Sequence, residues 1–364
     1  MKKIIKQIVG VDVSKDTLDA NLSFMDEEMI TQNIQSKCFM NTKKGINEMI
    51  KWFKKQCKND IPIKIVCEAT GVYYELLAYY MHEKGFEVSV VLPYKISSFM
   101  KSGNVRNIND KVCAQQIAEF GLLRKLVSWQ PPKENLRKLK GLTRERSQLI
   151  EERTMLKNRK HAQDISILTD ETTIKRSKLH IDFINKQIKL IEKQIREIVK
   201  EDVELANKIK KIITIDGVGF TTAVTVVAET DGFHLVRNGR QLVCYAGLDV
   251  IVKESGSSVK TKGKISHKGN KYLRRALYFP ALTNVNHKKS YKEFYDRIFE
   301  KHYIKMKAYV AVQRKMLMLM YTLWKNDTVF DPDYENKKAL NKSIKNLEQP
   351  KEVALTELVH DCSM

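Results

Sequence analysis

The fold of this chain is constrained most by two short apolar runs that each end in a carboxylate. Residues 4–13 read IIKQIVGVDV and include Asp12, and residues 63–68 read IKIVCE and end at Glu68. Runs of this length and composition are typical of strands that a sheet buries. A carboxylate at the end of a buried strand is costly unless a cation or hydrogen bonds satisfy it. We therefore interpret Asp12 and Glu68 as metal ligands, with capping or surface salt bridges as the alternatives.

The segments around these strands follow an informative order. Residues 17–24 read as the hairpin partner of the first strand, and residues 30–39 as a third strand. A helix capped by Asn41 comes next. A second helix, over residues 73–84, stops at a glycine before a strand over residues 86–92. Strand hairpin, third strand, helix, strand, helix and strand is the order found in ribonuclease-H-like domains, so we expect an α/β domain of this type.

The middle of the chain changes to long, charged helices. Six isoleucines alternate in steps of three and four, and three leucines upstream lie seven residues apart: Ile181, Ile184, Ile188, Ile191, Ile195 and Ile198, and Leu142, Leu149 and Leu156. Such spacing places each set on one face of a helix. We expect residues 129–207 to form two helices joined near residues 164–173. They would fold as an antiparallel coiled-coil hairpin, or pair between subunits, and act as a structural spacer.

A glycine turn lies near the start of the last globular region, residues 208–330, which we expect to be mainly α-helical. Gly217 and Gly219 flank a valine and precede an apolar helix. This pattern resembles a helix-hairpin-helix turn, whose free backbone N–H groups bind a phosphate. A simple tight turn is the alternative. From residue 331 the chain is polar and poorly patterned, so residues 331–364 are interpreted as a mobile tail.

A loop in this region sets three serines directly before a dense run of cations. The serines are Ser255, Ser257 and Ser258. The cationic or ionisable residues that follow are Lys260, Lys262, Lys264, His267, Lys268, Lys271, Arg274 and Arg275. A hydroxyl beside such positive charge is suited to attack a nucleic-acid phosphate. A solvated basic loop with turn-forming serines is the alternative reading.

The overall charge supports a polyanionic partner. The chain has 65 lysines and arginines against 43 aspartates and glutamates, a formal net charge of +22. No apolar run approaches the roughly 18–20 residues of a membrane-spanning helix, so we expect no membrane partner and a cytoplasmic, nucleoid-associated protein of a bacterium. Six cysteines without paired or zinc-finger spacing indicate reduced thiols rather than disulfides or zinc.

Several motifs in order resemble one family over roughly residues 5–325. They read VGVDVSKDTLDA, CEATGVYYELLAYYMHEKG, NDKVCAQQIAEFG, TIDGVGFTTAVTVVAE, RQLVCYAGL, ESG and KISHKGNKYLRRALY. The set is similar to the IS110 family of insertion-sequence transposases. The resemblance implies a RuvC-like domain over residues 1–128 that holds Mg²⁺ on four carboxylates, and a C-terminal domain that carries a serine nucleophile.

Residue by residue, Asp12, Glu68 and Asp110 match the first three acids of that set, and Ser255 matches the serine. Ser257 and Ser258 are chemically as capable. The family resemblance implies that Ser255 attacks a DNA phosphodiester and forms a phosphoserine link before strand exchange. It also implies a homodimer or tetramer, and a noncoding bridge RNA that selects donor and target DNA. Taken alone, Asp110 better suits the N-cap of a helix, and the metal-ligand reading prevails only when Asp12 and Glu68 are counted with it.

Two positions depart from the family pattern. The fourth acid, one helical turn after Asp110, is Cys113 here, and a thiol is a poor Mg²⁺ ligand. Asp216 stands where a proline commonly precedes the glycine turn. Cys113 leaves two alternatives open: a RuvC-like metal-dependent nuclease that uses only the carboxylate domain, and an impaired relative that binds nucleic acid without cutting it.

Overall fold

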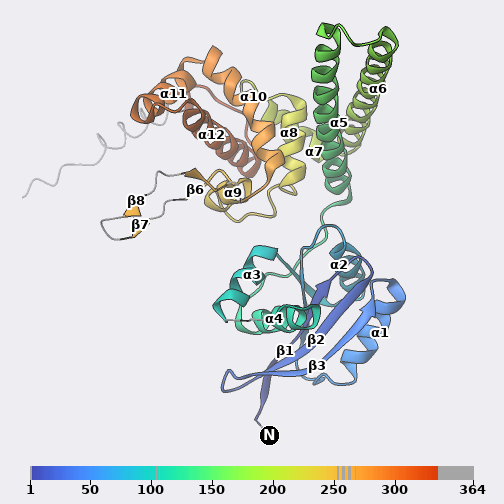
Figure 1. The fold of residues 1–364 in the computed structure, drawn as a ribbon. Coiled ribbons are helices and arrows are strands. Elements are labelled where there is room, and N and C mark those ends of the chain that lie inside the picture. The colour runs from blue at the N-terminus through green and yellow to red at the C-terminus, as the bar shows by residue number, and fades with distance from the viewer. Residues whose placement is uncertain are drawn as a thin grey trace, which may run out of the picture. The chain divides into compact units, whose positions relative to one another are not determined.

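The chain divides into two compact units, Met1–Pro131 and Pro132–Met364. The computed structural model describes residues 2–103, 105, 107–251, 254–255, 259–260, 264–266 and 268–334. Figure 1 shows a sheet with flanking helices in the first unit and an assembly of helices in the second. Among the described residues, no helix combines the length and apolar character that crossing a membrane requires.

A five-stranded sheet in the order β3-β2-β1-β4-β5 forms the centre of the first unit. The strands are β1 Ile4–Val13, β2 Thr17–Asp26, β3 Thr31–Met40, β4 Ile63–Glu68 and β5 Glu87–Val91. β1, β2 and β3 pair antiparallel, whereas β4 pairs parallel with both β1 and β5. This is the ribonuclease-H-like topology, which confirms the fold class predicted from the order of the apolar runs.

Successive residues of β1 point to opposite faces of the sheet. Val9 and Val11 belong to a core with helices α1 (Lys43–Lys54) and α2 (Tyr74–Glu83). Ile8 belongs to the other core, with helices α3 (Pro93–Ser102) and α4 (Asp110–Leu123). Even-numbered residues of β1 therefore face α4.

Glycines let α4 lie directly on the sheet. A Cβ atom on Gly10 would stand 2.2 Å from the backbone nitrogen of Ala118 and 2.4 Å from the carbonyl oxygen of Ala114. On the helix side, a Cβ atom on Gly121 would stand 2.9 Å from a methyl group of Val66. Because real Cβ atoms do not approach so closely, this contact fixes the position of α4 over β1 and β4.

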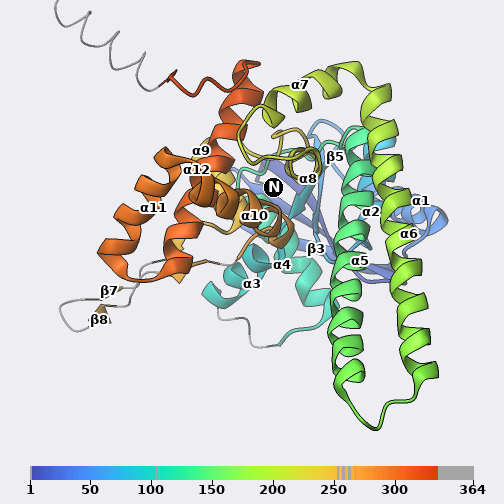
Figure 2. The same cartoon turned by 90° about the horizontal axis from the view of Figure 1, so that it is seen from above.

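In the second unit, α5 (Glu134–Ile165) and α6 (Glu171–Glu201) form an antiparallel helical pair, clearest in Figure 2. Ile181, Ile184 and Ile188 form a small buried cluster with Leu156. The later isoleucines of the pattern, Ile191 and Ile195, are buried in the main core of the unit instead. The pair is therefore continuous with the globular core at one end.

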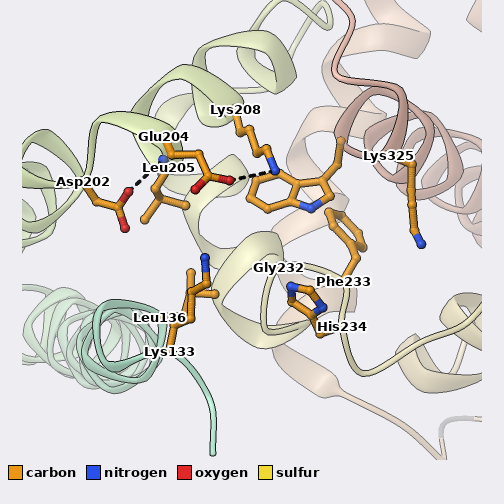
Figure 3. Close-up of a pocket in the computed structure, with 11 residues that line it drawn as sticks. Lys133, Leu136, Asp202, Glu204, Leu205, Lys208, Gly232, Phe233, His234 and Lys325 are labelled. Atoms are coloured by element: carbon orange, nitrogen blue, oxygen red, sulfur yellow. Dashed lines mark hydrogen bonds and ion pairs between the residues drawn. The ribbon is translucent and has the colours of Figure 1, made fainter.

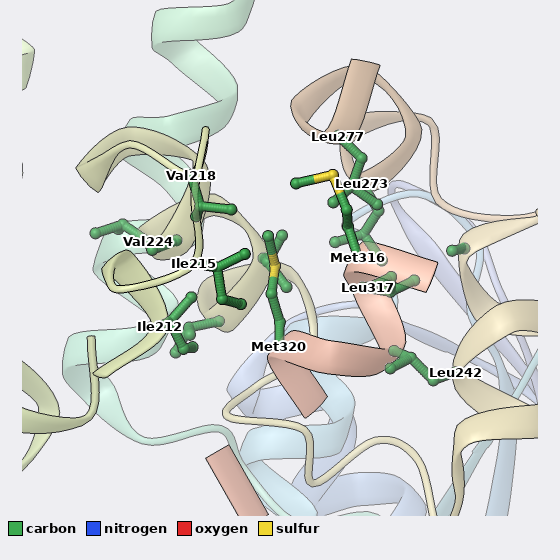
Figure 4. Close-up of a cluster of buried hydrophobic side chains, with 14 of the residues drawn as sticks. Ile212, Ile215, Val218, Val224, Leu242, Leu273, Leu277, Met316, Leu317 and Met320 are labelled. Carbon is green, nitrogen blue, oxygen red and sulfur yellow. The ribbon is translucent and has the colours of Figure 1, made fainter. Parts of the chain in front are cut away.

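Six further helices are present in the described part of the second unit. They are α7 Val203–Ile213, α8 Phe220–Glu229, α9 Gly239–Ala246, α10 Lys271–His287, α11 Lys289–His302 and α12 Lys305–Asn326. Their apolar faces meet in the core of Figure 4, where Met316 and Met320 are fully buried. Pro280 interrupts the hydrogen bonding of α10. The carbonyl that it leaves unpaired, that of Ala276, accepts a hydrogen bond from the Thr222 hydroxyl at 3.5 Å.

Some local predictions differ from the structure. Thr42, rather than Asn41, caps α1, because its hydroxyl accepts a hydrogen bond from the Gly45 N–H. Asn41 instead donates to the carbonyls of Ser14 and Tyr73. The predicted tail lies outside the described residues from residue 335 onward.

Candidate functional site

Two of the predicted acids lie side by side at the carboxyl ends of neighbouring parallel strands. The β1–β4 register pairs Val11 with Cys67, so Asp12 and Glu68 are the next residues along their strands. Asp12 follows Gly10 by two residues and Glu68 follows Val66 by two, and Gly10 and Val66 both contact α4, so the two acids share the α4 face of the sheet. The Thr70 hydroxyl donates a hydrogen bond to Glu68 Oε1 at 3.2 Å. The sheet register thus brings together two acids that are 56 positions apart in the sequence.

Asp110 joins them from the first turn of α4. Asn109 is the N-cap of this helix, since its side-chain oxygen accepts a hydrogen bond from the Val112 N–H at 2.9 Å. The alternative that Asp110 itself serves as the cap is therefore wrong. Burial raises the pKa of Asp12 to about 6, and repulsion from Asp110 and then Glu68 adds to the shift. The three acids are close enough to repel one another.

Cys113 lies one turn further along α4 and belongs to the same group. Burial raises the pKa of its thiol to about 11, and the charges of Asp12, Asp110 and Glu68 add to this effect. The thiol therefore stays protonated near neutral pH and carries no negative charge. Cys113 thus occupies the place that the family pattern gives to a fourth acid, but its side chain carries no charge.

The sequence reasoning missed a fourth nearby carboxylate, that of Asp19. The β1–β2 register pairs Asp12 with Asp19, and the β2–β3 register pairs Asp19 with Cys38. Burial raises the pKa of Asp19, a hydrogen bond with Cys38 lowers it, and Asp110 raises it. The alternating pattern of TLDANLSF could have indicated Asp19 from the sequence, because Leu18 and Ala20 are buried on the opposite face of the sheet. We call Asp12, Asp19, Glu68 and Asp110 the acid cluster.

The acid cluster fits a hard divalent cation by donor type, since carboxylate oxygens suit Mg²⁺ and a protonated thiol does not. Its closely spaced negative charges also have the electrostatic character of a cation site. In the part of the chain that the structure describes, however, no three such side chains are gathered closely enough to coordinate an ion. Asp12, Glu68 and Asp110 are the groups available to hold one.

In the second unit, the loop that carries Ser255 has a tightly closed stem. The Asn270 N–H donates to the Tyr245 carbonyl at 2.8 Å. Gly247 has a φ of 69°, and a Cβ atom on Gly269 would stand 2.4 Å from its nitrogen. Ser266 also forms a hydrogen bond with Asp249. We call residues 245–250, 264–266 and 268–274 the loop stem.

Beyond the stem, β6 (Val250–Ile251) pairs with β9 (Lys264–Ile265), and β7 (Glu254–Ser255) pairs with β8 (Val259–Lys260). The backbone of Ser255 is thus paired with that of Val259. Ser257 and Ser258 lie outside the described residues, as do Lys262 and His267.

A buried carboxylate that the sequence reasoning missed anchors the loop stem. Glu229, at the end of α8, is fully buried. It accepts hydrogen bonds from Arg144 Nε at 2.6 Å, Arg144 Nη2 at 2.8 Å and Asn270 Nδ2 at 2.6 Å. Asn270 also caps α10. An acid in the apolar run AVTVVAET was the available signal. The network ties the stem to helix α5.

The predicted nucleic-acid-binding residues differ in their exposure to solvent. Lys264, Lys268, Lys271 and Arg275 are exposed, on the loop stem and on α10. Lys260 is placed by its backbone, in β8. Arg274 is half-buried and donates from Nη1 to the Ala246 carbonyl at 2.9 Å, so it closes the stem. In the glycine turn, Gly217 has a φ of 74°, and Gly219 begins α8 without a side-chain cap.

A small cavity of about 220 Å³ lies elsewhere in the second unit (Figure 3). Lys208 at its edge pairs with Glu204 at 3.1 Å and stands 5.1 Å from the ring centre of Trp324. Asp202, another lining residue, accepts a hydrogen bond from the Leu205 N–H. The acids of the cavity are thus engaged within the protein, and none of the described site residues lines it.

Comparisons with known proteins identify a family of transposases. A family model described as "Transposase", that of the DEDD transposases of the IS110 type, matches residues 9–163. The model "Transposase IS116/IS110/IS902 family" matches residues 209–296. The pilin gene-inverting protein of Moraxella lacunata is 28% identical over 328 residues, which are 90% of this chain and 98% of that protein.

A transposase for insertion sequence element IS1111A, from Coxiella burnetii, is 23% identical over 312 residues, 78% of this chain and 79% of that protein. Among solved structures, Thermus thermophilus RuvC matches with 9% identity and a TM-score of 0.27, over 34% of this chain and 99% of RuvC.

An α/β domain with an acid cluster, joined to a helical domain with a basic loop, defines the class of the protein as a DNA transposase or recombinase. Within that class, the chain belongs to the IS110 family. The family predicted from the sequence motifs is confirmed.

Proposed function

We propose that this transposase cleaves and rejoins the DNA of an insertion sequence through a serine nucleophile and a metal-binding carboxylate site, guided by a noncoding bridge RNA. The observation that carries the proposal is that Asp12, Glu68 and Asp110 come from three separate segments and lie close enough for Asp110 and Glu68 to raise the pKa of Asp12. Converging acids of this kind are the usual way to bring Mg²⁺ to a phosphodiester.

Asp12, Glu68 and Asp110 would hold the Mg²⁺. When bound, the ion supplies positive charge that neutralises the phosphate undergoing attack. The protein side chains have a simpler role: Asp12 must lose its proton, and its pKa of about 6 allows this at neutral pH. Cys113 takes no part as a charged ligand, because its thiol stays protonated.

Ser255 would be the nucleophile. Its Oγ forms a bond to the DNA phosphorus, the bond from phosphorus to the leaving strand's oxygen breaks, and the serine proton ends on that oxygen. A hydroxyl from another strand end then attacks the phosphoserine, joins the two strands and regenerates Ser255. Each step breaks one phosphoester bond and forms another, so no external energy source or reductant is needed. The clamped loop stem supports this role, since it holds both ends of the serine loop on the rigid core.

The basic residues of the second unit would hold the nucleic acids. Lys260, Lys262, Lys264, His267, Lys268, Lys271 and Arg275 are the proposed phosphate contacts, together with the backbone around Gly217 and Gly219. Arg274 would support them from the stem. We further propose that the chain works as a homodimer or tetramer, as the family resemblance implies.

The test is recombination in cells from a plasmid that carries the element with its native flanks, scored by sequencing of the junctions. We expect junctions from the wild type and none from Ser255→Ala, with Ser257→Ala and Ser258→Ala as matched controls. Full recombination by Ser255→Ala would refute the serine mechanism. Metal-dependent cutting that survives Ser255→Ala but not Asp12→Ala would identify a nuclease instead.

The neutral thiol of Cys113 favours one alternative, an impaired relative that binds without cutting. Cys113→Asp separates it from the proposal. If the wild type forms no junctions and Cys113→Asp does, the chain is a transposase that has lost its fourth acid. If neither forms junctions, binding without catalysis is the function.

A further inference from the structure

Helix α10 presents a large aromatic side chain to solvent. Phe279 is 69% exposed, although it lies in a helix whose other apolar residues mostly face the core. A single exposed apolar residue needs no explanation by itself. The residues around Phe279, however, supply an explanation for its exposure.

The ring of Phe279 contacts one neighbouring aromatic side chain, which is part of a larger aromatic cluster. Tyr278 meets it edge-on, with the ring centres 5.4 Å apart. Tyr278 in turn contacts Tyr309 of α12, and Tyr309 packs at 4.7 Å against Tyr295 of α11, which is buried. Pro280 follows directly and is itself buried. Phe279 therefore lies at the exposed edge of this aromatic cluster.

Phe279 continues a line of exposed cations. Lys271, Arg275 and Phe279 are spaced four residues apart, so they lie on one stripe of α10, with a rise of roughly 6 Å between neighbours. All three are exposed. The helix contains no aspartate or glutamate. Arg275 forms an ion pair with Glu151 of α5, at a site where both side chains remain partly exposed.

This arrangement suits a nucleic-acid strand better than a protein surface. Protein interfaces have apolar centres from which lysines are depleted. On α10, the exposed residues after Phe279 are polar, namely Thr283, Asn286 and His287. Cations beside an exposed ring are instead typical of sites for single strands, where lysine and arginine bind phosphates and bases stack on aromatic rings.

We propose that Phe279 stacks on an unpaired base of a nucleic-acid strand whose phosphates are bound by Lys271 and Arg275. The inference rests on the proposed function, because it assumes that α10 contacts the nucleic acids of this transposase. The base must be unpaired, since bases within a duplex are already stacked and do not present a face to a side chain. The strand is a single-stranded segment of either RNA or DNA.

The test measures the affinity of the full chain for short labelled oligonucleotides by fluorescence anisotropy. Single-stranded RNA and single-stranded DNA form two arms that identify the source of the base. A duplex and a strand with abasic sites serve as controls. We expect Phe279→Ala to weaken binding of at least one single strand by about 5- to 150-fold, the range that base–aromatic stacking gives. Binding of the duplex and of the abasic strand should not change.

Two further variants sharpen the result. Phe279→Trp should retain affinity, and its added fluorescence should be quenched by the intact strand but not by the abasic one. Phe279→Leu, which keeps the apolar character but removes the ring, should behave like Phe279→Ala. The dependence of affinity on salt should stay the same in Phe279→Ala and become weaker in Lys271→Ala, since only the latter removes a phosphate contact.

Three outcomes would overturn the inference. Phe279→Ala could bind single strands as tightly as the wild type, or lose affinity equally for intact and abasic strands. Alternatively, it could change the oligomeric state while leaving affinity intact, which would assign Phe279 to an interface between copies of the chain. Because these assays involve no cleavage, stacking that persists while Ser255→Ala still recombines would refute the proposed mechanism and leave this inference standing.

Discussion

Two acids, one in each unit, have opposite surroundings. Glu229 is fully buried but receives three hydrogen bonds from Arg144 and Asn270. Asp12 is half-buried, and the charges that most affect its pKa are those of other acids, Asp110 and Glu68. A compensated acid of this kind holds a structure together, whereas an uncompensated one, surrounded by other acids, is typical of a functional site. The contrast separates the architecture of the loop stem from the chemistry of the acid cluster.

The largest effect is expected from breaking the compensated pair. Arg144→Ala leaves the buried carboxylate of Glu229 with Asn270 as its remaining donor, and we expect the second unit to lose about 3–5 kcal/mol of stability. Urea unfolding followed by the fluorescence of Trp324 measures this. The matched control is Arg146→Ala, whose partner Glu192 is partly exposed, with an expected loss below about 1 kcal/mol. Equal losses in both variants would contradict the contrast.

The acid cluster depends on the close approach of α4 to the sheet. In Gly10→Ala, the new methyl group would meet the backbone of Ala114 and Ala118, so we expect a loss of about 3 kcal/mol from the first unit. Affinity for Mg²⁺ should fall as well, because α4 carries Asp110. Unfolding followed by Trp52 and calorimetric titration with Mg²⁺ test both points.

The control for this variant is Gly141→Ala in α5, where a Cβ atom would meet nothing within 4 Å. There the same change should stabilise the helix by up to about 1 kcal/mol. A first unit that tolerates Gly10→Ala with full stability would show that α4 is not held by this contact.

Removal of the uncompensated acid should stabilise the protein. The pKa of Asp12 is raised in the folded state from 3.8 to about 6, so the folded chain binds a proton more tightly than the unfolded chain. Stability contributed by this group is therefore highest at low pH and is lost as the pH rises from about 4 to 6. We expect Asp12→Asn to be more stable than the wild type by roughly 2 kcal/mol at pH 7, allowing for partial solvent screening.

Unfolding of the first unit in EDTA between pH 4 and 8, followed by Trp52 fluorescence, measures this difference. The wild type should lose stability over the lower part of that range, and Asp12→Asn should lose less. Added Mg²⁺ should stabilise the wild type alone. An Asp12→Asn variant that is less stable at pH 7 would mean that Asp12 is compensated after all.

The same contrast shows what the sequence could predict. Short apolar runs were sufficient to predict the order of the strands and helices along the first unit, with Asp12 and Glu68 near strand ends, because burial of a strand and its end are local properties. Asp19 could not be predicted in the same way, because its place opposite Asp12 depends on the register of the hairpin. Glu229 was missed because its partners, Arg144 and Asn270, are 85 and 41 positions away.

Local boundaries failed for a different reason. Pro93 reads as the end of a strand, but it is also the first residue of α3, and proline is favoured at both places. Asn109 and Asp110 are adjacent and equally good caps by type, so only the structure distinguishes the cap from the acid that faces the cluster. In both cases two physically valid readings compete within one or two residues.

The smallest expected effect concerns Cys113. In Cys113→Asp the protonated thiol is replaced by a carboxylate on the α4 face that already carries Asp110, and Mg²⁺ affinity grows with the number of charged oxygen ligands. We expect binding to tighten about tenfold, equivalent to roughly 1.4 kcal/mol, in calorimetric titration. Cys113→Asn is the control, because it supplies an oxygen without the charge and should change the affinity little. If both variants bind Mg²⁺ with the affinity of the wild type, residue 113 does not contribute to Mg²⁺ binding, and the neutral thiol does not lower the Mg²⁺ affinity of the acid cluster.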